Sequence, residues 1–154
     1  MPDIEKTYKD LAKRHSLPDY SKLNAEFEIS LIESEAFLLR EIGRIITERI
    51  EYCTQMIDNL LHPEGSQLAL LHECRFFDDN EKKDLFETYK NLMMHHRSAI
   101  VASLSREEKE EAAFIMDFFN DWKSIKPKIL SMAKKMQGSW KTDAARDEIM
   151  GYFG

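Results

Sequence analysis

Apolar residues recur along this chain at the three- and four-residue spacing of an amphipathic α-helix. Ile4 and Tyr8 begin this pattern and predict a first helix from about Pro2 to His15, because proline is tolerated in the first helical turn. Pro18 ends the pattern, since the residue before a proline is disfavoured in the helical conformation. A short second helix is expected over residues 19–27, and it either continues directly into the next helix or bends near residues 28–30, where the apolar pattern shifts phase.

The most regular stretch runs from about Ser30 to Leu61 and keeps a seven-residue frame throughout. One column of this frame holds Ile32, Leu39, Ile46, Cys53 and Leu60. Apolar columns flank it on both sides, so the predicted helix has a wide apolar face. A helix of this kind is covered by two neighbours, and we expect it to be the long central helix of a bundle.

Three polar residues stand at positions where the pattern predicts burial. Glu35 and Arg49 interrupt an otherwise apolar column of the long helix, and His96 lies on the apolar face of a later helix. A buried charge requires a partner, so we expect Glu35 and Arg49 to pair with opposite charges on adjacent helices. For His96 we expect a hydrogen bond to a backbone or carboxylate group, with Glu35 and Tyr89 as the expected partners.

The remaining helices are marked by capping and breaking residues. A turn at residues 62–65 is followed by a short helix through Leu68 and Leu71, and acidic residues at 78–81 open a longer one. Ser105 and Glu108 predict a capping box that starts a helix to about Trp122. Two further helices are expected, a basic one opened by Ser124 and Pro127 and ending at Gly138, and a short one over 143–150.

Together these elements predict an all-α fold. We expect a single helical domain over residues 1–154, built as a bundle of about five to seven helices with one long central helix and with a peripheral basic segment at residues 123–154. The chain has only five glycines and four prolines among 154 residues, which favours long helices over the many turns of an all-β domain.

The sequence predicts a cytoplasmic protein. It has no apolar leader and no apolar run long enough to cross a bilayer. Cys53 and Cys74 each lie in an apolar helical pattern, and two isolated cysteines do not form a disulfide framework. We therefore expect both thiols to be reduced.

Charge is spread unevenly along the chain, whose formal net charge is −6. Residues 18–38 carry five acids and one base, whereas residues 123–146 carry seven bases and one acid. A local positive field of this kind favours contact with an acidic surface or a phosphate backbone. We expect the partner-binding residues to be Lys126, Lys128, Lys134, Lys135, Trp140 and Lys141.

The sequence lacks the residue spacings of several known metal-binding sites. No histidine follows a glutamate by three residues, which the metal sites of ferritin-like bundles require, and neither cysteine belongs to a zinc-binding pair. We expect no catalytic residue, no metal site and no cofactor. One resemblance is to the all-α nucleotide pyrophosphohydrolases of the MazG type, in which paired carboxylates hold Mg²⁺. The residues that carry it are Glu48, Glu51, Glu81 and Asp84.

The function expected from the sequence is that of a small intracellular protein-interaction module, acting as an adaptor or complex subunit without catalytic activity. Its partner would be another protein with an acidic surface, and self-association is an open alternative. A nucleic-acid-associated accessory protein that uses the basic segment is the second alternative. The third is a Mg²⁺-dependent nucleotide pyrophosphohydrolase, as the MazG-type resemblance implies.

Overall fold

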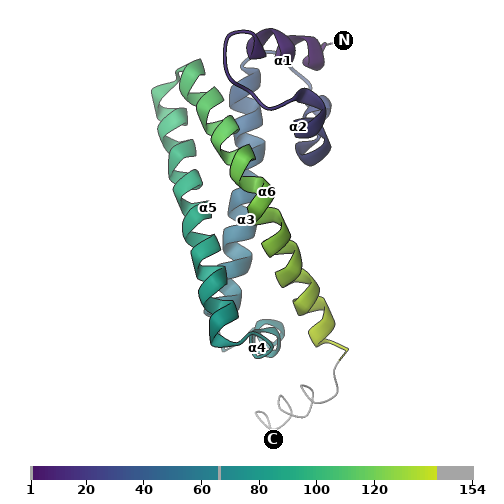
Figure 1. The fold of residues 1–154 in the computed structure, drawn as a ribbon, viewed down its shortest axis with the longest axis vertical. Helices are drawn as coiled ribbons and strands as arrows, with labels where there is room; N and C mark the ends of the chain where they lie inside the picture. The colour runs from purple at the N-terminus through teal and green to yellow at the C-terminus, as the bar shows by residue number, and fades with distance from the viewer. Residues whose placement is uncertain (1, 66, 142–154) are drawn as a thin grey trace, which may run out of the picture. The chain divides into compact units, whose positions relative to one another are not determined.

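A computed structural model describes residues 2–65 and 67–141. These residues form six α-helices and one 3-10 helix and contain no strand, so the predicted all-α bundle is confirmed, with α3 as its long central helix. Figure 1 labels the α-helices. The elements are α1 (Ile4–Ala12), α2 (Tyr20–Phe27), η1 (Ile29–Leu31), α3 (Leu38–Leu61), α4 (Leu68–Cys74), α5 (Asp79–Ser105) and α6 (Glu108–Ser139).

The chain divides into two compact units. Unit 1 consists of Met1–Tyr52 and Met93–Lys123, and unit 2 consists of Cys53–Leu92 and Ser124–Gly154. Helices α3, α5 and α6 contribute residues to both units, and each unit has buried apolar residues of its own. The organisation of residues 1–154 as a single domain stays a prediction.

Unit 1 has a core rich in aromatic side chains. The ring of Phe118 is fully buried, and its centroid lies 6.1 Å from that of Phe27 and 5.4 Å from that of Trp122. The indole Nε1 of Trp122 donates a hydrogen bond of 3.0 Å to the carboxylate of Glu26 in α2. A buried aromatic cluster with a satisfied polar atom therefore joins α2 to α6.

Unit 2 combines an aliphatic core with polar contacts at the helix ends. Its fully buried side chains include Ile57, Leu60 and Leu92. At the start of α5, the backbone N–H of Glu81 donates to Asp78 Oδ1 at 2.8 Å, and the backbone N–H of Asp78 donates to Glu81 Oε1 at 3.1 Å. This reciprocal pair is a capping box, and it satisfies two amide groups that the helix leaves free.

Helix α3 begins at Leu38, eight positions after the predicted start at Ser30. The preceding segment turns away from the helical path at Glu28, whose φ of 52° is left-handed, and the side chain of Asn24 then accepts the backbone N–H of Ser30 at 2.8 Å. Ile29 is fully buried while Leu31 is exposed. The seven-residue frame is therefore wrong before Leu38, because a local cap took the backbone groups that a helix would have used.

Helix α6 continues from Glu108 to Ser139, where the sequence predicted two separate helices. Pro127 lies inside it, although proline removes one hydrogen bond and usually breaks a helix. The buried stripe stays in phase across this proline through Trp122, Ile125, Ile129 and Met132. Burial of that continuous stripe outweighs the local cost. The helix predicted over 143–150 lies outside the described residues.

None of the helices in the described part of the chain has the length and apolar character needed to cross a lipid bilayer. Cys53 and Cys74 are free thiols, the first buried and the second half-buried.

Candidate partner-binding surface

The predicted partner-binding lysines lie in unit 2, and two of them make ion pairs within that unit. Lys128 Nζ lies 3.5 Å from Asp84 Oδ1, and Lys135 Nζ contacts Glu81 Oε2. Lys135 Nζ also lies 5.2 Å from the ring centroid of Phe77. These groups line a pocket of about 330 Å³ formed by α5, α6 and Phe77. Acidic residues of α5 therefore neutralise part of the basic segment.

Glu81 is the acid most affected by this arrangement. The hydrogen bond from Lys135 holds the pKa of the Glu81 carboxyl below its ordinary value, and the backbone N–H of Asp78 lowers the pKa further. Glu81 is therefore ionised at neutral pH and serves both the cap of α5 and the contact with α6.

Trp140 is 55% exposed, yet its indole makes two contacts with α4. Nε1 donates to Glu73 Oε2 at 3.0 Å, and the ring centroid lies 4.0 Å from that of His72. His72 is itself buried, and its Nε2 donates to the backbone carbonyl of Ser139 at 3.0 Å. The end of α6 is thus held to α4 by three polar and aromatic contacts. The other predicted partner-binding residues, Lys126, Lys134 and Lys141, are exposed.

The predicted burial of Glu35 is wrong, because this residue precedes α3 and is exposed. Its carboxylate accepts the backbone N–H of Asp3. Arg49 is half-buried in α3. Its guanidinium carbon lies 5.3 Å from the ring centroid of Phe27 and 6.0 Å from that of Trp122, which is a cation–π arrangement. We had expected Arg49 to contact a carboxylate, and the structure places these two aromatic rings beside it.

Two adjacent histidines of α5 contact different helices of unit 1. His96, which the sequence singled out, is half-buried, and its Nε2 lies 3.3 Å from Glu51 Oε1 of α3. The expected partners were Glu35 and Tyr89. His95 is the buried one, 3% exposed, and its Nε2 lies 2.6 Å from Asp121 Oδ2 of α6. Apolar spacing did not reveal this, because neighbouring residues differ by only about 100° around the helix axis.

Each carboxylate behind the MazG-type resemblance contacts a basic side chain. Glu48 pairs with Arg44, Glu51 with His96, Glu81 with Lys135 and Asp84 with Lys128. Within residues 2–65 and 67–141, no group of three or more His, Cys, Asp or Glu side chains is arranged to hold a metal ion. The Mg²⁺-dependent hydrolase stays an untested alternative.

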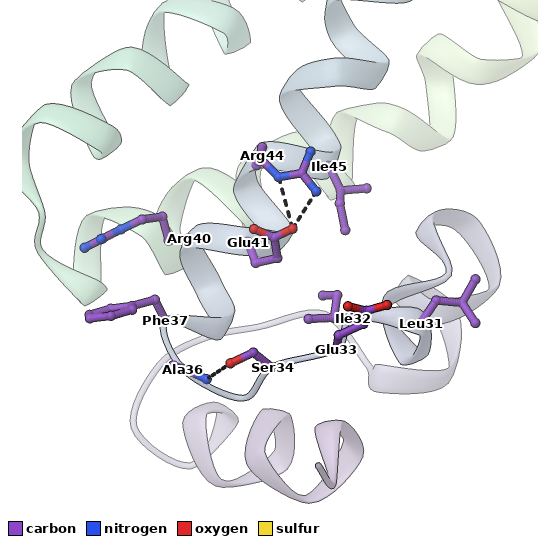
Figure 2. A pocket seen from close by; sticks show the side chains of 10 residues that line it. All are labelled: Leu31, Ile32, Glu33, Ser34, Ala36, Phe37, Arg40, Glu41, Arg44 and Ile45. Carbon is purple, nitrogen blue, oxygen red and sulfur yellow. Dashed lines mark hydrogen bonds and ion pairs between the residues drawn. The ribbon is translucent and has the colours of Figure 1, made fainter. Parts of the chain in front are cut away.

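A pocket that the sequence did not predict lies in unit 1, where the chain enters α3. It has a volume of about 600 Å³ and is lined by residues between Leu31 and Ile45 (Figure 2). Leu31 and Phe37 are 72% and 71% exposed and lie at opposite ends of the view in Figure 2. Ile32 and Ile45 are half-buried. The pocket thus combines apolar side chains with an open entrance.

Phe37 adopts a backbone conformation that bulky residues avoid. Its φ is 55°, in the left-handed region, which costs about 1–3 kcal/mol for a residue with a side chain of this kind. The guanidinium of Arg40 lies 4.6 Å from the Phe37 ring centroid and also reaches Glu111 at 3.5 Å. The strained backbone and the arginine together hold an aromatic ring outward. The apolar spacing gave no sign of this, because it placed Phe37 inside a helix.

Some of the polar groups of this pocket are paired with each other. Arg44 donates to Glu41, and this hydrogen bond lowers the pKa of the Glu41 carboxyl (Figure 2). Ser34 Oγ accepts the backbone N–H of Ala36 at 3.2 Å. The ten lining residues include no histidine or cysteine. The pocket is therefore lined by apolar and by charged side chains in similar number.

Comparisons of the chain with protein-family models, with curated proteins and with solved structures found no match.

Proposed function

We propose that this chain is a protein-interaction module, an adaptor or subunit of a cytoplasmic complex without catalytic activity. The observation that supports it best is Phe37, an aromatic side chain held outward in a strained conformation at a pocket lined by apolar and charged side chains. The cytoplasmic location stays a prediction.

The strain at Phe37 is the reason to regard it as a binding residue. A left-handed conformation would cost glycine little, so selection for stability alone favours glycine at this position. Rigid aromatic side chains are frequent anchors of protein interfaces, because they bury a large area with few rotatable bonds. In this proposal an apolar side chain of the partner protein enters the pocket, and its neighbour packs against the Phe37 ring.

The experiment is affinity capture with the wild-type chain as bait, followed by quantitative mass spectrometry. Phe37→Gly is the informative variant, because it removes the ring and relieves the strain. We expect the variant to lose the wild-type partner and to unfold with a free energy about 1 kcal/mol higher. Tyr52→Ala is the matched control, since it deletes an equally exposed aromatic ring of α3 outside the pocket. Equal recovery of every captured protein by Phe37→Gly and wild type would contradict the proposal.

The alternatives based on the basic segment have a separate test. Lys134 and Lys141 are exposed and make no ion pair within the described residues, so a nucleic-acid contact would depend on them. If nucleic acid is the partner, binding must fall steeply with salt and with the double variant Lys134→Glu and Lys141→Glu. A titration with single- and double-stranded oligonucleotides at two salt concentrations decides between the two partners.

A further inference from the structure

The part of α5 that belongs to unit 1 carries an exposed apolar face centred on one arginine. Met93, Met94, Ile100 and Val101 stand at the third and fourth positions before and after Arg97, and Leu104 follows two turns later. Residues at these spacings are neighbours on a helix surface. We call these six residues the Arg97 face.

The Arg97 face points away from the core of unit 1. His95 and Ala102, on the other side of the same helix, are buried, and His95 and His96 reach α6 and α3. By contrast Met94, Val101 and Leu104 are 55%, 61% and 78% exposed. Single exposed apolar residues are ordinary, but a contiguous set along three turns is typical of an interaction site.

The guanidinium of Arg97 is oriented by its neighbours. Its Nη1 donates to His96 Nδ1 at 2.8 Å, and His96 Nε2 faces Glu51 Oε1 at 3.3 Å. Because Nδ1 accepts, Nε2 carries the ring proton of the neutral imidazole. No carboxylate of the described residues pairs with Arg97. The other N–H donors of the Arg97 guanidinium are therefore available to a carboxylate at the centre of an apolar surface.

We propose that the Arg97 face binds an amphipathic helix of another protein, one whose apolar side carries an aspartate or glutamate that pairs with Arg97. The inference rests on the proposed function and specifies a partner element for it. The face is about 17 Å long at a rise of about 1.5 Å per residue, which matches a helix of three or more turns. The two methionines, one turn before Arg97, adapt to different apolar side chains.

The charge pattern argues against a second copy of this chain as the occupant. Residues 93–104 contain no acidic side chain. A two-fold axis through the centre of the face would bring Arg97 close to its own symmetry mate, and no carboxylate of the face would neutralise the two charges. A partner with an acid at this place has the complementary pattern.

The test uses two fluorescent synthetic peptides that form the same leucine-rich amphipathic helix. One has a glutamate in the middle of its apolar side, and the matched peptide has a lysine there. For the full-length chain we expect the glutamate peptide to bind about tenfold more tightly by anisotropy. Arg97→Glu should reverse this order. Lys109→Glu, a change at an exposed lysine of α6 in the same unit, should leave it unchanged.

Three results would overturn the inference. They are equal binding of the two peptides, failure of both to bind, and a wild-type dimer in sedimentation that Val101→Glu converts to monomer. The proposed function is judged separately by its own capture experiment. If the peptides fail while capture still depends on Phe37, only the inference about the Arg97 face is wrong. If capture does not depend on Phe37 while the chain still binds the glutamate peptide more tightly than the lysine peptide, only the Phe37 proposal is wrong.

Discussion

Exposed aromatic and basic groups have different surroundings in the two units. In unit 2 the exposed Trp140 bonds to Glu73, and Lys128 and Lys135 contact acids of α5. In unit 1 the exposed Phe37 borders an open pocket, and Arg97 has no carboxylate partner among the described residues. A run of like charges in sequence thus says little about its partners, because acids distant in sequence neutralise part of it in the folded chain.

The largest predicted effect concerns the aromatic core of unit 1. Phe118 is fully buried against Phe27, Trp122 and His95. Phe118→Ala should lower the free energy of unfolding by about 3–5 kcal/mol, because it removes a large side chain and leaves a cavity. Ile46→Ala in α3 should cost about 2–5 kcal/mol for the same reason. Denaturant unfolding measures both, and a loss below about 0.5 kcal/mol for either would contradict the core described for unit 1.

A smaller effect is expected for the contact between α4 and α6 in unit 2. Trp140→Ala removes the hydrogen bond to Glu73 and the ring contact with His72, which together are worth about 1–2 kcal/mol. Partner capture should be unchanged, because the account gives Trp140 a structural role. A variant of unaltered stability that no longer captures its partner would show instead that Trp140 is a binding residue.

The smallest effect is the pH dependence at Glu81. Its pKa is lowered in the folded chain, so its contribution is present above the ordinary value of 4.5 and is lost as the pH falls through the folded pKa. Glu81→Gln should remove that part of the acid destabilisation and cost less than about 1 kcal/mol at neutral pH, because more than a third of each side chain of the pair with Lys135 is exposed and water screens the two charges. Unfolding curves at neutral pH and below pH 4.5 test this. Identical acid sensitivity of variant and wild type would contradict it.

The sequence predicted the helices well, because apolar spacing reports burial. Ile46 and Leu60 are fully buried, as their column of the seven-residue frame predicts. The same frame failed before Leu38, where the left-handed Glu28 and the side chain of Asn24 redirect the chain. It also failed at Pro127, where continued burial of α6 outweighs a local helix breaker. The spacing of apolar residues alone does not predict whether a local helix cap or the packing of distant residues decides where a helix ends.

The candidate surfaces were much less predictable. Phe37 was assigned to a helix, and its left-handed backbone has no signature in the spacing of apolar residues. The Arg97 face has the same periodicity as a core stripe, and the spacing therefore does not show that Ile100 and Leu104 are exposed. A sequence gives the width of an apolar face but not which part of it another helix covers.

Hydrogen exchange of the full chain, with and without the protein recovered by affinity capture, tests the central claim most directly. The account predicts slower amide exchange on binding in residues 29–45, 93–105 or both, and unchanged exchange in residues 126–141. Protection confined to residues 126–141 would contradict it, because the basic segment would then be the contact and the exposed apolar surfaces of unit 1 would not be.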